Sequence, residues 1–254
     1  MLRIQENFSL EIDNCPEFPL EFIWSEPGTF IMGCENENQP SSGLESPFTV
    51  KITHGYWLAK FMLTEQQFNF LDIEQKSKES INTNPIPKLN FSWFEAMNLC
   101  SWLNKTYFNL LPQSYGFSLP AEIEWEYAAK CGKVNSYSFD WKNLPDDINK
   151  WGWFKENSNQ VPHPVGTKNA NPWGFFDMIG NGFEWCYDAF EEYPEEETVD
   201  WIGRKSKDFK TLRSSSYKGS FKDPSFRVTF RTYVPPKTQM GGLRLAISQR
   251  PYFD

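Results

Sequence analysis

The residues with the clearest chemical potential lie between Asn171 and Asp188, where oxygen-bearing side chains alternate with glycines and aromatic rings. The oxygen donors in this stretch are Asp177, Asn181, Glu184 and Asp188, and its glycines are Gly174, Gly180 and Gly182. Glycines that allow tight turns, beside amide and carboxylate oxygens, suit a site for a hard cation. The alternative is a buried aromatic turn whose polar groups bond to nearby backbone, and the residue types alone favour this alternative.

The composition excludes one broad class of function. The chain has 254 residues with 25 basic and 33 acidic side chains, a formal net charge of -8, so we expect no nucleic-acid partner. The length allows one large domain or two small ones. Aromatic residues make up 17% of the chain, with 11 tryptophans, which predicts irregular structure held by aromatic anchors.

No targeting or membrane segment is visible in the sequence. The first residues lack an apolar core and a small-residue cleavage site, and no apolar run approaches the roughly 20 residues that span a bilayer. We therefore expect a cytoplasmic protein with no membrane partner. The cysteines are scattered and form no C-x-x-C motif: Cys15, Cys34, Cys100, Cys131 and Cys186. With only His54 and His163 beside them they predict buried thiols and not a zinc site, and a disulfide remains the alternative.

Several strands are predicted from alternating apolar residues. Residues 21–25 and 29–33 form an expected hairpin around the turn Glu26-Pro27-Gly28. Further strands are expected at 48–52, at 56–61, at 242–247, and as two short strands within 210–231. Residues 1–20 are interpreted as an N-terminal extension, an edge strand plus a loop, packed on the domain.

Three helices are predicted from start signals and apolar spacing. Thr64 to Gln67 has the form of a capping box, and Ser92 can cap a second helix whose apolar residues follow helical spacing. A third helix is expected from Pro120 to Gly132, with early glutamates and a late lysine that complement the helix dipole. No internal repeat or domain boundary is evident, so residues 21–254 are predicted to form one α+β domain.

Seven phrases of the sequence occur in the order found in one known family. They are P-G-T-F-I-M-G at 27–33, Y-W-L-A-K-F-M-L-T at 56–64, F-S-W-F-E-A at 91–96, L-P-A-E-I-E-W-E-Y-A-A at 119–129, P-V-G at 164–166, N-P-W-G-F-F-D-M-I-G-N-G-F-E-W at 171–185 and G-G-L-R-L-A at 241–246. Together they resemble the formylglycine-generating enzyme (sulfatase-modifying factor) family. The resemblance implies a variant of the C-type lectin fold, rich in irregular structure. It also implies a calcium site, here Asn181, Gly182 and Glu184.

The catalytic residues of that family do not carry over to this chain. The family's oxidases end with two cysteines that bind copper(I) and convert a substrate cysteine into formylglycine with oxygen, and soft thiolates suit this metal. Here Gly219 and Pro224 occupy the two thiolate positions, and no cysteine follows Cys186. We therefore expect neither copper nor oxidase activity.

The retained phrases and the missing thiols favour a non-catalytic pseudo-enzyme that acts as a protein- or peptide-binding or regulatory module. The candidate surface is the segment that replaces the active site, with Tyr217, Lys218, Phe221, Lys222, Phe226, Arg227 and Arg231. Tyrosine, phenylalanine and arginine suit contact with another protein or peptide. The structural alternative is that at least half of these residues belong to the core or to ion pairs.

Two other hypotheses remain open at this point. One is an enzyme of the same family with altered oxidoreductase chemistry, whose acid–base groups would come from Asp177, Glu184, Asp188 and Asp223, although no spacing distinguishes them from structural carboxylates. The other is a ligand binder diversified by a retroelement, since such variable proteins can use the fold that the resemblance implies, with variation near the C-terminus.

Overall fold

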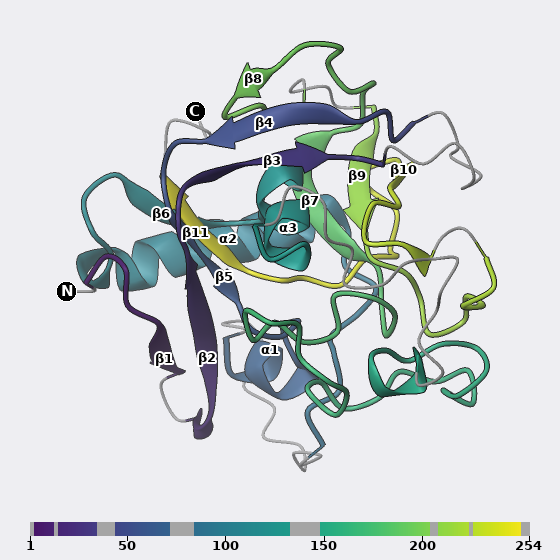
Figure 1. Cartoon of the computed structure of the whole chain (residues 1–254). Coiled ribbons are helices and arrows are strands. Elements are labelled where there is room, and N and C mark those ends of the chain that lie inside the picture. The colour runs from purple at the N-terminus through teal and green to yellow at the C-terminus, as the bar shows by residue number, and fades with distance from the viewer. Residues whose placement is uncertain are drawn as a thin grey trace.

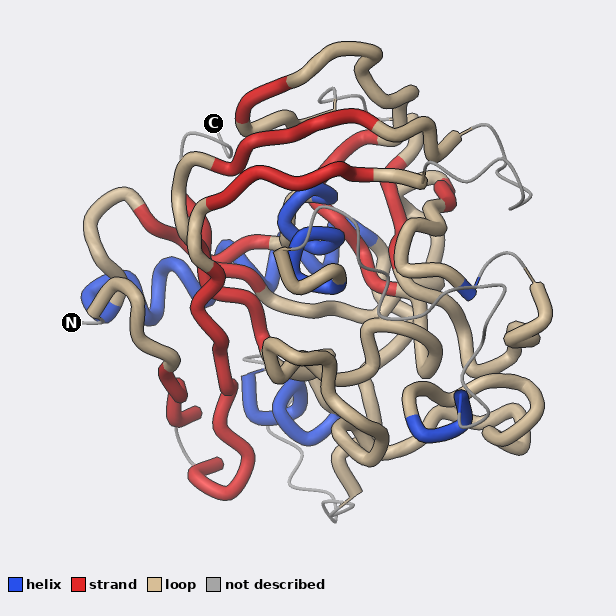
Figure 2. Tube along the Cα trace, viewed as in Figure 1, coloured by secondary structure: helices blue, strands red, loops and turns tan. Residues whose placement is uncertain are grey.

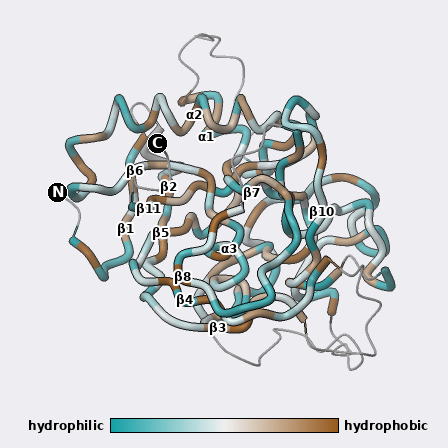
Figure 3. The backbone as a smooth tube through the Cα atoms, turned by 90° about the horizontal axis from the view of Figure 1, so that it is seen from above, coloured by the Kyte–Doolittle hydropathy of each residue, from teal (hydrophilic) through white to brown (hydrophobic). Residues whose placement is uncertain are grey.

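The computed structural model describes residues 3–12, 15–34, 44–71, 84–132, 148–203, 208–223 and 226–249, with the side chains of 15–17 left aside. Within these ranges the fold is mixed α+β with little helix, and long loops join its three sheets (Figures 1 and 2). Hydrophobic and hydrophilic residues are interspersed along the loops as well as along the strands (Figure 3). Aromatic contacts anchor loops to the helices, as where the Trp173 ring packs edge-on against Tyr127 of α3 (Glu122–Ala129) with ring centroids 5.3 Å apart.

The largest sheet has five strands in the order β1-β2-β5-β11-β6, and all its neighbours are antiparallel. Its strands are β1 (Phe8–Ile12), β2 (Cys15–Ser25), β5 (Tyr56–Ala59), β6 (Tyr115–Ser118) and β11 (Ala246–Gln249). β2 runs without a break through residue 20, where the sequence suggested a boundary between an N-terminal extension and the domain. β1 is an edge strand of this sheet, as expected.

The second sheet contains β3 (Gly28–Met32), β4 (Phe48–Ile52) and β8 (Thr198–Val199). β3 pairs with β4, so the predicted hairpin between residues 21–25 and 29–33 is wrong. Alternation identifies a strand but does not name its partner. In the five-stranded sheet, β2 pairs with β5 on the side away from β1, and Trp24 lies opposite Trp57. After Ser25 the chain leaves the five-stranded sheet and enters the second sheet as β3.

The third sheet has the order β10-β9-β7, with β7 (Glu184–Ala189), β9 (Lys210–Arg213) and β10 (Thr232–Val234). Of the two short strands expected within residues 210–231, the first is β9. The second is β10, which begins at Thr232, one residue beyond the expected range. The closing strand begins at Ala246, four residues later than predicted, because Gly241 and Gly242 make isolated bridges to Phe91 and Glu184 instead.

The helices are α1 (Glu65–Leu71), α2 (Trp93–Tyr107) and α3 (Glu122–Ala129), with short 3-10 turns η1 (Phe108–Leu110) and η3 (Ile148–Lys150). Both predicted capping signals are confirmed. Thr64 Oγ1 accepts the Gln67 N–H at 3.2 Å, and Gln67 Oε1 accepts the Thr64 N–H at 3.0 Å. Ser92 and Glu95 form the same reciprocal pair at the start of α2. None of the helices within the described ranges has the length and apolar character needed to cross a membrane.

Two hydrophobic cores hold these elements together. The first lies between the five-stranded sheet and α2, and the second joins β3 and β4 to α3. Every residue of α3 is buried, so its glutamates must find their partners inside the protein. Cys100 and Cys186 are also buried, and burial raises the pKa of the Cys100 thiol to about 12, which makes it unreactive.

Candidate functional site

The stretch from Asn171 to Asp188 joins several parts of the fold. Asn171 Nδ2 donates to the Ala128 carbonyl at 2.9 Å, which ties the stretch to the end of α3. Asp177 has a φ of 54°, and its Oδ2 accepts the Gly166 N–H at 2.9 Å. Its Oδ1 has no hydrogen-bond partner among the described residues, and burial raises the pKa of this carboxyl to about 6. These contacts give the stretch a structural role.

The residues implied for calcium direct their polar side-chain atoms to protein partners. Asn181 Oδ1 accepts the His163 N–H, and its Nδ2 donates to the His163 carbonyl, both at 3.0 Å. Glu184 receives two bonds of 2.8 Å from the Arg244 guanidinium and one from an indole N–H, while Gly182 offers only backbone. Calcium takes about six to eight oxygen ligands, and since the side chains of Asn181 and Glu184 are already hydrogen-bonded to protein groups, a calcium ion here would depend largely on backbone carbonyls. Across the described ranges no group of three or more His, Cys, Asp or Glu side chains is placed to hold a metal ion.

Asp188 closes the stretch with a second structural carboxylate. Its Oδ2 accepts the Glu122 N–H at 2.7 Å, at the first residue of α3, and its Oδ1 accepts the Gly203 N–H at 2.8 Å. Burial, together with the nearby Glu122 carboxylate, raises the pKa of Asp188 to about 7. The carboxylate therefore joins the start of α3 to the loop after β8.

Three charged residues converge on Glu122 and Glu126, the two glutamates one turn apart on α3. Arg231 donates to both oxygens of Glu122, at 2.8 and 2.6 Å. Arg213 bridges Glu122 at 3.0 Å and Glu126 at 2.5 Å. Lys130 lies 2.6 Å from Glu126. Burial alone would raise the pKa of Glu126, but the charges of Lys130 and Arg213 outweigh it, so the pKa is lowered.

This ion network is the feature that sequence reasoning missed. The glutamates of α3 were assigned to the helix dipole, whereas the side chains of Glu122 and Glu126 are fully buried. The available signal was the helix itself, since residues 119–131 carry apolar side chains on every face. A glutamate in such a helix cannot reach solvent and needs either a buried cation, as Glu122 and Glu126 have, or a carboxyl that stays protonated near neutral pH, as in Glu124.

Residues 214–223, the first part of the candidate segment 214–231, are held by their own turns and by the loop 153–168. Ser214 has a φ of 64° and is buried, and Ser215 Oγ accepts the Gly180 N–H at 3.1 Å. Gly219 donates to the Ser216 carbonyl at 2.8 Å. Pro224, at the second predicted thiolate position, lies outside the described residues.

The facing loop contributes both contacts and aromatic rings. Lys155 N–H donates to the Gly219 carbonyl at 2.9 Å, and Ser158 Oγ donates to the Tyr217 carbonyl at 2.8 Å. His163 stacks on Trp153 with ring centroids 3.6 Å apart, and its Nε2 lies 2.8 Å from the Ser158 carbonyl. His163 therefore bonds to backbone within a loop.

The seven residues of the candidate surface fall into two groups. Phe226, Arg227 and Arg231 are buried, and Arg227 pairs with Glu45 at 2.8 Å. The residues that reach solvent in whole or in part are Tyr217, Lys218, Phe221 and Lys222. We call these four residues the exposed surface.

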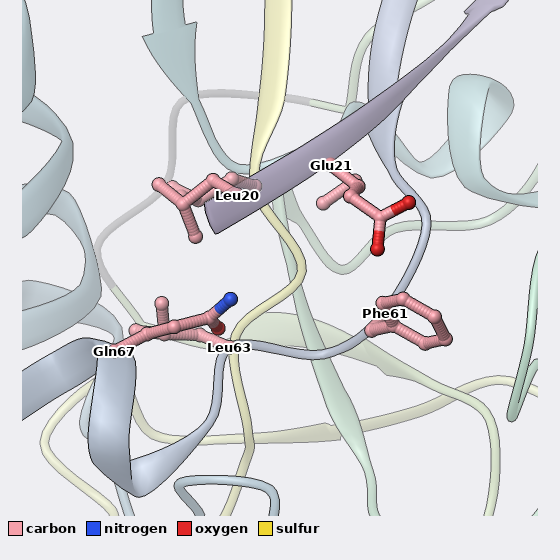
Figure 4. Close-up of a pocket in the computed structure, with 7 residues that line it drawn as sticks. Leu20, Glu21, Phe61, Leu63 and Gln67 are labelled. Atoms are coloured by element: carbon pink, nitrogen blue, oxygen red, sulfur yellow. The ribbon is translucent and has the colours of Figure 1, made fainter. Parts of the chain in front are cut away.

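A small pocket lies elsewhere, between β2, the segment after β5 and Leu245 (Figure 4). Leu20, Leu63 and Phe61 give it an apolar lining. Glu21 at its rim pairs with a neighbouring lysine at 2.9 Å, and Gln67 bonds to Thr64 in the cap of α1. Its polar groups are thus engaged by the protein itself, and the pocket offers no chemistry.

The family comparison agrees with the geometry. Residues 12–249 match the model of the sulfatase-modifying factor enzyme 1-like domain, and the chain belongs to this family. The structure of Treponema denticola variable protein 1 superposes with a TM-score of 0.75 at 21% identity, covering 94% of this chain and 98% of that one. The prediction of an α+β fold of this family, rich in irregular structure, is therefore confirmed.

Three curated proteins that are similar to this chain carry names that describe different functions. The chain is 24% identical to chaperone protein LppX of Paenibacillus barcinonensis, over 58% of this chain and 66% of that protein. It is 29% identical to the formylglycine-generating enzyme of Streptomyces coelicolor, over 62% and 50%. It is 31% identical to inactive C-alpha-formylglycine-generating enzyme 2 of Bos taurus, over 41% and 34%. The matches thus span between one third and two thirds of these relatives.

Proposed function

We propose that this chain is a non-catalytic member of its family that uses the exposed surface to bind another protein or a peptide. The proposal rests on the resemblance of the sequence phrases, which assigns Gly219 to a position where family oxidases have a copper-binding cysteine. Its N–H and carbonyl are both engaged, by Ser216 and Lys155, so the segment is a fixed piece of surface. Tyr217 and Phe221 lie on either side of it.

The buried thiols of Cys100 and Cys186 do not suit copper(I). Copper(I) needs thiolates that can reach it. Cys186 is the last cysteine in the chain, and burial raises its pKa well above the usual range. A Cβ added at Gly219 would also lie 3.1 Å from the Phe226 ring, so the position has little room for a side chain. The similarity to a relative named as inactive gives the proposal further support.

The alternative, an enzyme with altered oxidoreductase chemistry, has less support from the geometry. The pKa values of Asp177 and Asp188, about 6 and 7, would suit acid–base work. However, both carboxylates are buried and accept backbone N–H groups of the scaffold. Their raised pKa values are a consequence of burial and do not require a catalytic role.

The non-catalytic half of the proposal predicts that the purified protein, titrated with copper(I), will not convert a cysteine-containing sulfatase peptide to its aldehyde. No oxygen uptake beyond that of the peptide and copper alone is expected, because Gly219 and Pro224 are assigned to the two thiolate positions. Oxygen consumption and the peptide mass are the measurements. A family oxidase that has both cysteines serves as the positive control, and copper-dependent aldehyde formation by this chain would refute the proposal.

The binding half predicts that the double variant Tyr217→Ala/Phe221→Ala recovers its protein partner from a lysate of the native host at least roughly tenfold less well than wild type. The matched control is Phe108→Ala, since Phe108 is 58% exposed and lies on η1, outside the exposed surface. Quantitative mass spectrometry of the captured proteins is the measurement. Thermal unfolding shows whether each variant is folded, and equal recovery by a folded double variant would remove the exposed surface from consideration.

A further inference from the structure

Lysines gather on the part of the molecule that carries the exposed surface. We define the lysine lobe as residues 148–169 together with 214–223, which lie among the loops at the lower right of Figures 1 and 2. Its lysines are Lys150, Lys155, Lys168, Lys218 and Lys222. Over the same two ranges the acidic side chains are Glu156 and Asp223 alone. The lobe is therefore locally cationic in a chain whose net charge is -8.

The two segments of the lobe form one surface. Glu156 accepts hydrogen bonds from the Ser220 hydroxyl and from the Phe221 N–H, the latter at 3.3 Å. Together with the bond from Lys155 to Gly219, these contacts cross between the segments. The Glu156 carboxylate keeps its negative charge and attracts Lys222, and the excess of positive charge comes from the five lysines of the lobe against its two carboxylates.

Three of these lysines lie within about 6 Å of an aromatic ring. Lys168 Nζ lies 3.6 Å from the centroid of the Trp153 ring. Lys218 Nζ lies 5.4 Å from the Tyr217 ring, and Lys222 Nζ lies 6.0 Å from the Phe221 ring. A cation that rests on a ring face loses less side-chain freedom on binding, yet keeps its N–H donors for a carboxylate. Lys218 and Lys222 are exposed and can make such contacts.

We infer that the lysine lobe binds a segment of another protein that is rich in aspartate and glutamate. The inference rests on the proposed function and adds the chemistry of the partner. Ammonium groups on an aromatic surface complement carboxylates, because opposite charges steer the encounter and the rings supply apolar contact area. A basic segment would be repelled by the same lysines.

The inference is tested by fluorescence polarisation with three short labelled peptides, one rich in glutamate, one in lysine and one in serine. The glutamate peptide is expected to bind at least roughly tenfold more tightly than the other two. Its affinity should fall as salt rises from about 50 mM to about 200 mM, since exposed charges are screened over this range. Equal affinities for the three peptides would overturn the inference.

Charge-reversal variants locate the binding site. Lys218→Glu/Lys222→Glu is expected to weaken binding of the glutamate peptide at least roughly tenfold. The control Lys105→Glu/Lys237→Glu changes the net charge equally at two exposed lysines outside the lobe, and should leave the affinity within about twofold. An equal loss in both variants would mean that only net charge matters, and would overturn the inference.

The host-partner capture separates this inference from the proposed function. If Tyr217→Ala/Phe221→Ala loses the partner while the peptides show no preference for acid, the binding surface stands and the acidic partner is wrong. If the double variant keeps the partner and the peptides show no preference, both proposals fail. If wild type captures an Asp- and Glu-rich partner that Lys218→Glu/Lys222→Glu does not, both stand.

Discussion

Replacing Arg244 with methionine is expected to lower the free energy of unfolding by about 3–5 kcal/mol. Arg244 and Glu184 form a fully buried pair through two hydrogen bonds of 2.8 Å. The guanidinium also donates to the carbonyls of Ala59, Lys60 and Phe176. Methionine fills similar space but leaves a buried carboxylate and three carbonyls without these donors. Urea unfolding, followed by tryptophan fluorescence, measures the loss.

Two further variants separate the lost charge from the lost packing. Glu184→Gln/Arg244→Met removes the orphaned charge, so we expect it to recover part of the stability that Arg244→Met loses. Lys222→Met removes one exposed positive charge and should stay within about 0.5 kcal/mol of wild type. If Arg244→Met matched Lys222→Met in stability, the buried pair would not have the structural role assigned to it.

The protein is expected to become less stable as the pH rises from about 5 to about 8. The pKa values of Glu124 and Asp188 are each raised to about 7, and that of Asp177 to about 6, in each case chiefly by burial. Below these values the folded protein holds protons that the unfolded chain releases near pH 4, so the folded state is favoured. Stability is lost as the pH rises through the folded pKa values. Glu124 alone corresponds to a change on the order of 2–3 kcal/mol.

The variant Glu124→Gln tests the assignment of this pH dependence. Glutamine can accept the Ala121 N–H and donate to the Ser248 hydroxyl, the two partners of Glu124, without titrating. We therefore expect a flatter dependence of the unfolding free energy on pH and higher stability than wild type at pH 8. Urea midpoints measured at several pH values decide the matter, and a variant whose slope equals that of wild type would contradict the role of Glu124.

Local signals in the sequence predicted local structure well. The caps at Thr64 and Ser92 were predicted because the donor and acceptor groups lie three residues apart, so nothing distant can alter the pairing. The pairing of β3 depended instead on which strand edges were available, and β5 had already taken the inner edge of β2. The alternation of apolar residues identifies a strand but does not show which neighbouring strand it pairs with.

In the candidate site, too, the local sequence shows the residue types but not their partners, which lie far away in the sequence. Asn181 and Glu184 have the residue types of a cation site, yet their partners are His163, 18 residues away, and Arg244, 60 residues away. Residue types alone cannot tell an oxygen that awaits a metal from one that is bonded to a guanidinium. For the same reason, the burial of Arg231 was evident only once α3 was in place beside it.

The ion network on α3 also sets the order in which the chain can fold. Glu122 is separated from Arg213 by 91 residues and from Arg231 by 109. While the chain is being synthesised, α3 emerges long before either arginine, and its final position would then bury two carboxylates without these partners. We therefore expect α3 to dock late, together with the C-terminal third of the protein. Contacts of such long range make folding slow and leave the apolar surface of α3 exposed to other chains until synthesis is nearly complete.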